Sequence, residues 1–378
     1  MMNEKIVRPG LQGVIAAETR LSRVDGLAGE LIIAGYPLDN LALNATFEEV
    51  VYLLWHDKLP TKAELTEFQS ELANLREIPS IAIDTLREAS KQSLSVMDAL
   101  RMVAGLVSLN SNPDDATQSA KAVLAAIPTI VAAYWRLLSA KEPIAPLNEL
   151  SHAANYLYML DGDIPSDERV RALNTYLNTV VDHGFNASTF AARVIISTQS
   201  DMISAIVGAI GALKGPIHGG APGPALDMVF EIGKAENAEA YLREKLSAGE
   251  RLMGFGHRVY KVRDPRADVL NHAAEQFFAE GDQRDLYNLV RHVEDTAIRL
   301  LDEYKPGRNL QTNVEFYTAL VLHGIGLETA LFTPTFAVSR VAGWTAHALE
   351  HLDGGRLLRP LSQYTGETDR QFVPLAER

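Results

Sequence analysis

The sequence predicts an all-α protein built from two helical domains. Apolar residues recur at helical spacing along most of the 378 residues, and segments with strand character are few. A chain of this length is longer than one hydrophobic core usually serves, which favours two domains. With 47% hydrophobic and 22% charged residues, the chain can bury a substantial core.

Two capping boxes predict helix starts in the first part of the chain. Thr46 precedes Glu49 by three residues, and Thr61 precedes Glu64 by three. In each pair the two side chains can satisfy backbone amides that a helix N-terminus leaves without partners. Upstream, residues 30–34 (ELIIA) form the best candidate for a short strand.

Longer helices are expected over residues 98–109, 116–138, 166–181 and 187–213. Breaks rich in Gly and Pro follow at 214–224, 253–257 and 305–308. Charge density rises between the first break and about residue 325. This pattern indicates a smaller domain inserted into a larger and more apolar one.

Composition excludes several classes of function. The chain has no cysteine, which excludes disulfides and thiolate catalysis, and its net charge is −13. Such an acidic surface argues against nucleic acid or an anionic membrane as partners. The N-terminus lacks the apolar core of a secretory signal, and apolar stretches such as 203–213 fall short of the roughly 18 residues that span a bilayer. We therefore expect a cytoplasmic enzyme or binding protein.

Residues 251–266 are strongly basic in this acidic chain. They contain five Arg or Lys residues against the single acid Asp264. Arginine binds carboxylates through its planar fork, and lysine also suits phosphates. Asp264-Pro265 predicts a helix N-cap and first residue, which places Arg266 at a helix N-terminus. A solvated basic loop would explain the composition equally well.

Three further residues have both a structural and a functional interpretation. His218 lies in KGPIHGGAPG, where it either hydrogen-bonds a carbonyl or acts as a neutral donor near a helix that begins at Pro222 or Pro224. His183 follows a helix in a polar cluster, in which Asn186 or Ser188 can serve as an N-cap. Glu315 is either a first-turn acid that the helix dipole stabilises or a general base. Motifs of metal sites, P-loops, Rossmann folds and nucleophile elbows are absent from the sequence.

Taken together, several segments resemble the citrate synthase family in their order and spacing, over essentially the whole chain. They are GLQGVIAAETRLSRVDGLAGELIIAGY, LLWHDKLPT, VDHGFNASTF, KGPIHGGAP, MGFGHRVYKVRDPRAD, TNVEFYTA, LFTPTFAVSRVAGW and RPLSQYTG. The resemblance implies an all-α homodimer whose large and small domains close over the substrates. By the family pattern, the large domain comprises 1–220 and 326–378, and the small domain comprises 221–325.

The resemblance also implies the roles of individual residues. His218 would hydrogen-bond the thioester carbonyl as the enolate forms, His257 would act as general acid on oxaloacetate, and Glu315 would be the base. Oxaloacetate would further contact His183 and three arginines, namely Arg266, Arg340 and Arg359, the last from the other subunit. Coenzyme A would lie along Leu252, Met253, Gly254, Phe255 and Gly256, with its phosphates near Lys261 and, as weaker candidates, Lys305 and Arg308. Acetyl-CoA is a substrate in this scheme, and no cofactor or metal is implied.

One position departs from the family pattern. The usual base is Asp in an NVD or NID motif, whereas this chain has Glu315, whose extra methylene displaces the carboxylate by ~1 Å. Two alternatives therefore stay open: a 2-methylcitrate synthase that uses propionyl-CoA, and a homologue that binds ligand or assembles without turnover. The chain length also leads us to expect a dimer without NADH inhibition.

Overall fold

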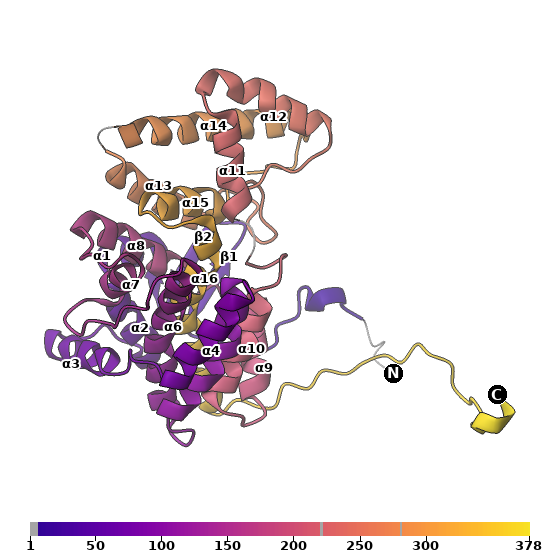
Figure 1. Cartoon of the computed structure of the whole chain (residues 1–378). Helices are drawn as coiled ribbons and strands as arrows, with labels where there is room; N and C mark the ends of the chain where they lie inside the picture. The colour runs from indigo at the N-terminus through magenta and orange to yellow at the C-terminus, as the bar shows by residue number, and fades with distance from the viewer. Residues whose placement is uncertain (1–6, 220–221, 280–281) are drawn as a thin grey trace.

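The computed structural model describes residues 7–219, 222–279 and 282–378 (Figure 1). The strands are β1 (Ser22–Asp25), β2 (Glu30–Ile33) and β3 (Tyr36–Pro37). The first helices are α1 (Leu38–Asn44), α2 (Phe47–His56), α3 (Lys62–Ala73), α4 (Ser80–Lys91), α5 (Val96–Ala104), α6 (Ala116–Leu138), α7 (His152–Asp161) and α8 (Asp167–Val180). The remaining helices are α9 (Ala187–Ile196), α10 (Met202–Leu213), α11 (Pro222–Ile232), α12 (Ala238–Ser247), α13 (Pro265–Phe277), α14 (Asp282–Tyr304), α15 (Val314–Gly324) and α16 (Phe332–Leu352).

The helices form two groups (Figure 1). Helices α1–α10 and α16 build the larger, lower body, and α11–α15 lie together above it. Helix α13 joins the groups, because it packs on α15 and also on α8 and α1. The small antiparallel sheet β1-β2-β3 lies where the groups meet. The predicted boundary between residues 220 and 221 lies outside the described residues, and the division into domains stays a prediction.

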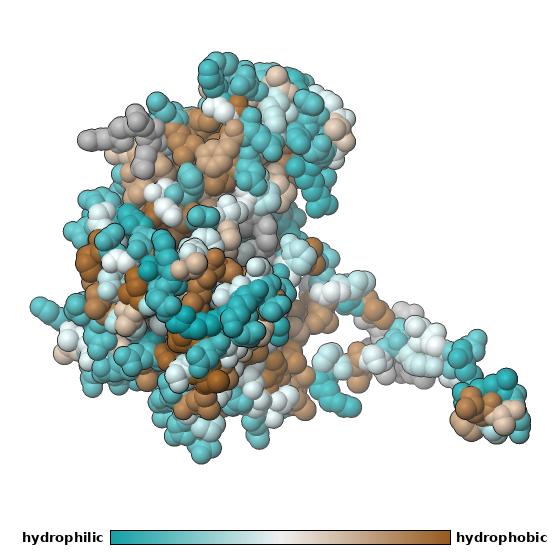
Figure 2. All heavy atoms as spheres, in the orientation of Figure 1, coloured by the Kyte–Doolittle hydropathy of each residue, from teal (hydrophilic) through white to brown (hydrophobic). Residues whose placement is uncertain are grey.

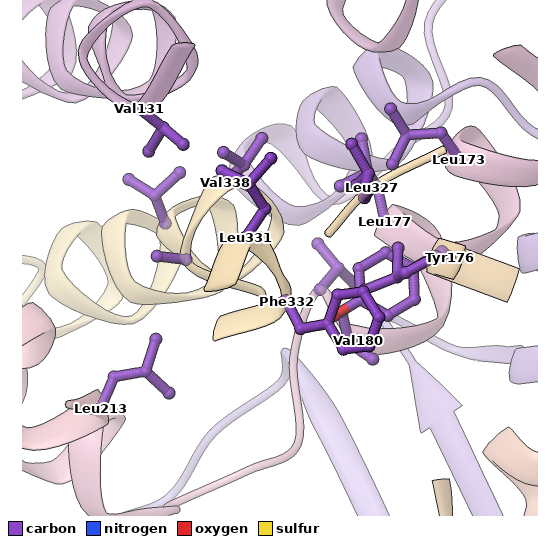
Figure 3. Close-up of a cluster of buried hydrophobic side chains, with 14 of the residues drawn as sticks. Val131, Leu173, Tyr176, Leu177, Val180, Leu213, Leu327, Leu331, Phe332 and Val338 are labelled. Atoms are coloured by element: carbon purple, nitrogen blue, oxygen red, sulfur yellow. The ribbon is translucent and has the colours of Figure 1, made fainter. Parts of the chain in front are cut away.

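The core of the lower body surrounds α6, which is buried along most of its length and packs on α16, α5 and α4. Figure 3 shows a neighbouring apolar cluster that joins α8 to α16 through Tyr176, Leu177, Phe332 and Val338. This cluster fixes the C-terminal end of α8 against the first third of α16. Two predicted site residues, His183 and Arg340, are thereby held close to each other in space.

Helix starts agree well with the sequence prediction. Both capping boxes are present: the Thr46 hydroxyl accepts from the Glu49 amide at 3.3 Å, and Thr61 and Glu64 repeat the arrangement at the same distance. Helix α6 has the predicted bounds, and the strand candidate at residues 30–34 is confirmed as β2.

Two predicted helices were wrong in extent. The segment 187–213 is two helices rather than one, since α9 ends at Ile196 and Gln199 adopts a left-handed φ of 65°. Asp201 then caps α10 by accepting from the Ser204 amide at 2.8 Å. In the segment 98–109, the α-helix ends at Ala104 and a 3-10 turn continues it.

The expectation that the apolar stretches are too short to span a bilayer was wrong for helix α6. It contains an 18-residue window with a mean hydropathy of at least 1.2 and few charges, which is long and apolar enough to cross a bilayer. However, 72% of that window is buried inside the fold. Its apolar residues are therefore already covered by α16, α5 and α4, as in the central helix of a globular core.

The C-terminal segment 353–378 leaves the lower body and runs away from it as an extended chain (Figure 1). Leu358 is tied to the body through its amide, which donates to the Ser197 hydroxyl at 3.1 Å. Beyond that point, large apolar side chains are exposed, among them Leu361, Tyr364 and Phe372. Figure 2 shows apolar atoms at the far end of this segment.

Candidate active site

Five of the predicted site residues come from separate turns that the helices bring together. His183 follows α8, His218 lies between α10 and α11, and His257 lies in the loop before α13. Arg266 and Glu315 each lie in the first turn of a helix, α13 and α15 respectively. Each of these residues therefore lies at or near a helix end, where backbone N–H or C=O groups lack partners within the helix.

Three aromatic rings meet at the junction of the two helical groups. The His183 and His257 ring centroids are 6.0 Å apart, and Tyr260 lies against both. The Tyr260 hydroxyl is 3.1 Å from Nε2 of His183. Burial, with the charges of Arg266 and Arg340, holds the pKa of His183 well below its usual range, so this ring is neutral.

Nδ1 of His257 accepts two backbone hydrogen bonds, from the amides of Val259 at 3.0 Å and Tyr260 at 3.1 Å. Burial, and then the charge of Arg266, lower the pKa of His257 to about 4. The ring is therefore neutral at physiological pH. Its other nitrogen, Nε2, lies 3.3 Å from Nη2 of Arg266.

Arg266 is buried and held by Asp264, the N-cap of α13. The Asp264 carboxylate accepts from Nε of Arg266 at 3.0 Å and from Nη2 at 2.8 Å, and it also accepts from the Arg266 amide. The predicted N-cap is confirmed. Because the same carboxylate accepts from the Val314 amide at 3.2 Å, it links the starts of α13 and α15.

Arg340 lies in the middle of α16 and is almost fully buried, with 1% of its surface exposed. Its Nε donates to the Val180 carbonyl at 2.6 Å. Burial lowers its pKa to about 10, although the nearby Asp182 carboxylate opposes that shift. A buried guanidinium that still carries its charge is well suited to bind a carboxylate.

Glu315 begins α15, where Asn313 is the N-cap and its side chain accepts from the Glu315 amide at 3.1 Å. Burial raises the pKa of the Glu315 carboxyl, and the charge of Arg266 only partly offsets that effect. Among the described residues, Oε2 of Glu315 is buried without a hydrogen-bond partner. A carboxylate with a raised pKa and a free oxygen is suited to accept a proton.

His218 is held by the first turn of α9. Its Nε2 lies 2.8 Å from the Ser188 hydroxyl and 3.3 Å from the Ser188 amide. Trp344 of α16 donates to the same hydroxyl at 3.0 Å. Burial, with the charge of Arg340, lowers the pKa of His218 to about 4, which keeps the imidazole neutral.

The predicted coenzyme A segment is hydrogen-bonded to the turn that precedes Glu315. The Gly256 amide donates to the Gln311 carbonyl at 2.7 Å, and the Asn313 amide donates to the Gly254 carbonyl at 2.9 Å. Both glycines have positive φ, and a Cβ on Gly254 would lie 2.8 Å from the Phe316 ring. The chain's own packing therefore already requires glycine here, independently of any close approach by a ligand.

The residues predicted to bind phosphates lie at the edge of the site. Lys261 is exposed, and its carbonyl accepts from Asn309 at 2.8 Å. The turn from Lys305 to Arg308 ends just before Asn309 and thus lies beside Lys261. In contrast, Arg359 is exposed in the extended C-terminal segment, and its own chain does not bring it to the buried cluster.

Several residues of the cluster were not assigned a role from the sequence. Ser188 was considered only as a helix cap, whereas the cap is Asn186 and the Ser188 hydroxyl contacts His218. Tyr260 was part of a quoted segment without a function. Their signal was weak because a serine or a tyrosine has no distinctive spacing, and only the fold reveals their neighbours.

A second buried network lies beside the site in the lower body, around Asp182, which precedes His183. His347 contacts Asp182 at 3.2 Å through Nε2, and Arg193 lies 3.0 Å from its Nδ1. Arg193 also donates to Glu350 at 2.7 Å. Within the described residues, no group of three or more acidic or histidine side chains is arranged to hold a metal ion.

Comparison with known proteins adds independent findings. A family model described as citrate synthase, C-terminal domain, matches residues 10–361. The chain is 42% identical over 377 residues to citrate synthase 2 of Bacillus subtilis strain 168, and the match covers 98% of each chain. It is 38% identical over 371 residues to 2-methylcitrate synthase of Mycobacterium tuberculosis, covering 96% of this chain and 92% of that one. Its fold matches a solved ternary complex of citrate synthase from Thermoplasma acidophilum with carboxymethyl coenzyme A and oxaloacetate, with a TM-score of 0.88, 31% identity and coverage of 99% and 100%.

Proposed function

The chain belongs to the citrate synthase family of acyltransferases, and on that premise we propose that the buried histidines, arginines and glutamate described above form its active site. The family resemblance and the helical fold predicted from the sequence are confirmed. The reaction is the condensation of acetyl-CoA with oxaloacetate, followed by hydrolysis of citryl-CoA to citrate and coenzyme A.

The observation that carries the proposal is the pairing of His257 with Arg266. Because Nδ1 of His257 accepts two backbone N–H groups, the ring hydrogen is on Nε2. Arginine can only donate, so the 3.3 Å approach of its Nη2 places two donors side by side without an acceptor between them. An oxygen atom of oxaloacetate would complete this arrangement.

Oxaloacetate carries two carboxylates and a ketone, and the cluster offers a group for each. Arg340 and Arg266 would bind carboxylates, and Nε2 of His257 would donate to the ketone oxygen. Neutral His183, whose ring centroid lies 6.0 Å from that of His257, would also contact the substrate. Since the arginines are already buried and ordered, substrate binding need not order them, and the ketone is fixed for attack.

The first chemical step would be removal of a proton from the methyl group of acetyl-CoA. The Glu315 carboxylate takes this proton, and the electrons of the broken C–H bond move to the thioester oxygen as an enolate. Neutral His218 donates a hydrogen bond to that oxygen. The enolate carbon then attacks the ketone carbon of oxaloacetate, whose oxygen is protonated by way of His257.

The second half of the reaction is hydrolysis of the citryl thioester. Water adds to the thioester carbonyl, the carbon–sulfur bond breaks, and the sulfur leaves with a proton as the thiol of coenzyme A. The exposed Lys261 and the adjoining turn from Lys305 to Arg308 would attract the phosphates of coenzyme A. Loss of the thioester makes the overall reaction irreversible.

We also propose a homodimer in which Arg359 enters the partner's site. The segment after Leu358 exposes Leu361, Tyr364 and Phe372, and large apolar side chains gathered on an extended segment favour cover by another surface. Arg359 lies in the same segment and carries a charge suited to the substrate carboxylate. A symmetric exchange of these segments would complete both sites.

The preferred thioester is tested by the release of free thiol. The purified chain is supplied with oxaloacetate and either acetyl-CoA or propionyl-CoA, and a thiol reagent detects coenzyme A without background, because the chain has no cysteine. We expect faster turnover with acetyl-CoA. Preference for propionyl-CoA would favour the 2-methylcitrate alternative, and release from neither thioester would refute the proposed active site.

A further inference from the structure

We propose that Glu294 is a positioning residue that aligns the base Glu315. Glu294 lies in α14, outside the cluster proposed as the active site, and only 1% of its surface is exposed. The proposal rests on the proposed function, because it assumes that Glu315 removes the proton.

Four side chains donate to the Glu294 carboxylate. Oε1 accepts from Nη1 of Arg263 and from the Thr312 hydroxyl, both at 2.6 Å. Oε2 accepts from the Tyr317 hydroxyl at 2.5 Å and from Nη1 of Arg291 at 2.7 Å. A buried carboxylate is costly unless its oxygens are fully paired, and this one is paired on both oxygens.

The donors belong to the two segments that carry the proposed chemistry. Arg263 lies in the loop between His257 and Arg266, and Thr312 and Tyr317 lie on either side of Glu315. Glu294 thus holds the loop and the turn against α14. The backbone bonds from Gly256 to Gln311 and from Asn313 to Gly254 join the same two segments from the side of the site.

The geometry of α15 explains how the hydrogen bond between Glu294 and Tyr317 orients the side chain of Glu315. Glu315 and Tyr317 are two residues apart on α15, so their side chains point about 200° apart around the helix axis. When the Tyr317 hydroxyl is fixed on Glu294, Glu315 points away from Glu294 and α14. A longer side chain than the usual aspartate makes such fixing more important, because it adds a rotatable bond.

The variant that tests this is Glu294→Gln, which keeps the shape of the side chain but replaces one acceptor by a donor. That donor must then face either Arg263 and Thr312 or Arg291 and Tyr317. We expect kcat to fall at least about tenfold, since a shift of ~1 Å can cost ~10²-fold in rate. KM for oxaloacetate and for acetyl-CoA should change less than about threefold.

A matched control comes from the same helix. Glu303 also lies in α14, but it is half-exposed and pairs at 2.8 and 2.9 Å with Arg243 of α12 rather than with the loop or the turn that Glu294 holds. Glu303→Gln should retain wild-type kcat. If Glu294→Gln fails to fold, Tyr317→Phe removes one donor and should show the same loss of kcat in weaker form.

A double-mutant cycle separates positioning from general damage. If Glu294 acts through Glu315, then Glu294→Gln should change the residual turnover of Glu315→Gln less than about twofold. If Glu294→Gln lowers kcat by the same factor in the Glu315→Gln background as in the wild type, the proposal is overturned. A folded Glu294→Gln variant with wild-type kcat would also overturn it. An inactive wild type would instead overturn the proposed function, so the two failures are distinguishable.

Discussion

The hydroxyl of Ser188 lies 2.8 Å from Nε2 of His218, and the backbone amide of the same serine lies 3.3 Å from that nitrogen. The Ser188 hydroxyl is itself held on both sides, because it donates to Oδ1 of Asn186 at 2.8 Å and accepts from Trp344 at 3.0 Å. The orientation of the His218 ring is therefore fixed by a serine that α9 and α16 hold in place.

Ser188→Ala should lower kcat by about tenfold to a hundredfold, because it removes a hydrogen bond that orients the neutral imidazole. KM for oxaloacetate should be nearly unchanged, since Ser188 contacts none of the arginines in the cluster. Thiol release measures both parameters. Ser70→Ala, at an exposed serine of α3, is the control and should behave as the wild type. Equal kcat in the two variants would contradict the role of Ser188.

Because Glu315 must be ionised, kcat should begin to fall at an unusually high pH as the solution is made more acidic. The base must be ionised, and burial raises the pKa of its carboxyl. As pH falls, the carboxylate is therefore protonated earlier than an ordinary glutamate would be, and kcat declines with it. A pH series of turnover, with stability checked at each pH, measures this limb. A kcat that stays constant down to the ordinary pKa of 4.5 would be evidence against Glu315 as the base.

Glu315→Gln should inactivate the protein and yet stabilise it. The folded-state pKa lies above the unfolded one, so the carboxyl favours folding at low pH and loses that contribution as pH rises through the folded pKa. At neutral pH the buried charge is thus unfavourable, and a neutral amide removes it. We expect turnover to fall by ~10²–10⁴-fold while the unfolding midpoint in urea rises. A lower midpoint would show that Glu315 is well paired in the folded protein.

A chain that lacks Arg359 should regain activity when its dimer partner supplies this arginine. When Arg359→Ala and Glu315→Gln chains are co-expressed, each hybrid dimer would hold one site with both defects and one intact site. Random pairing makes about half of the dimers hybrids, so about a quarter of wild-type activity should return. Activity no higher than that of the separate variants would mean that Arg359 serves its own chain.

Thr46→Ala should lower the free energy of unfolding by about 1 kcal/mol, because it removes the N-cap of α2. The Thr46 hydroxyl accepts from the Glu49 amide, and the Glu49 carboxylate returns a bond to the Thr46 amide at 2.7 Å. Urea denaturation gives the change. Thr66→Ala, at an exposed position of α3, should differ from the wild type by less than about 0.5 kcal/mol.

Much of the local structure could be predicted because its causes are local. A capping box needs only Thr46 and Glu49, and an N-cap followed by proline needs only Asp264 and Pro265. The prediction for 187–213 was wrong because apolar spacing continues across the break. Only the left-handed Gln199 and the new cap at Asp201 separate the two helices.

The sequence by itself determined the helical fold, the family and the chemical types of the proposed site residues, because periodicity, caps and ordered motifs are carried by neighbouring residues. Only the tertiary structure decided which side chains meet. Ser188 reaches His218, Tyr260 reaches His183, and Glu294 reaches Thr312 and Tyr317. The pKa shifts of the histidines and Glu315 likewise depend on burial and on charges from distant helices, which no local pattern encodes.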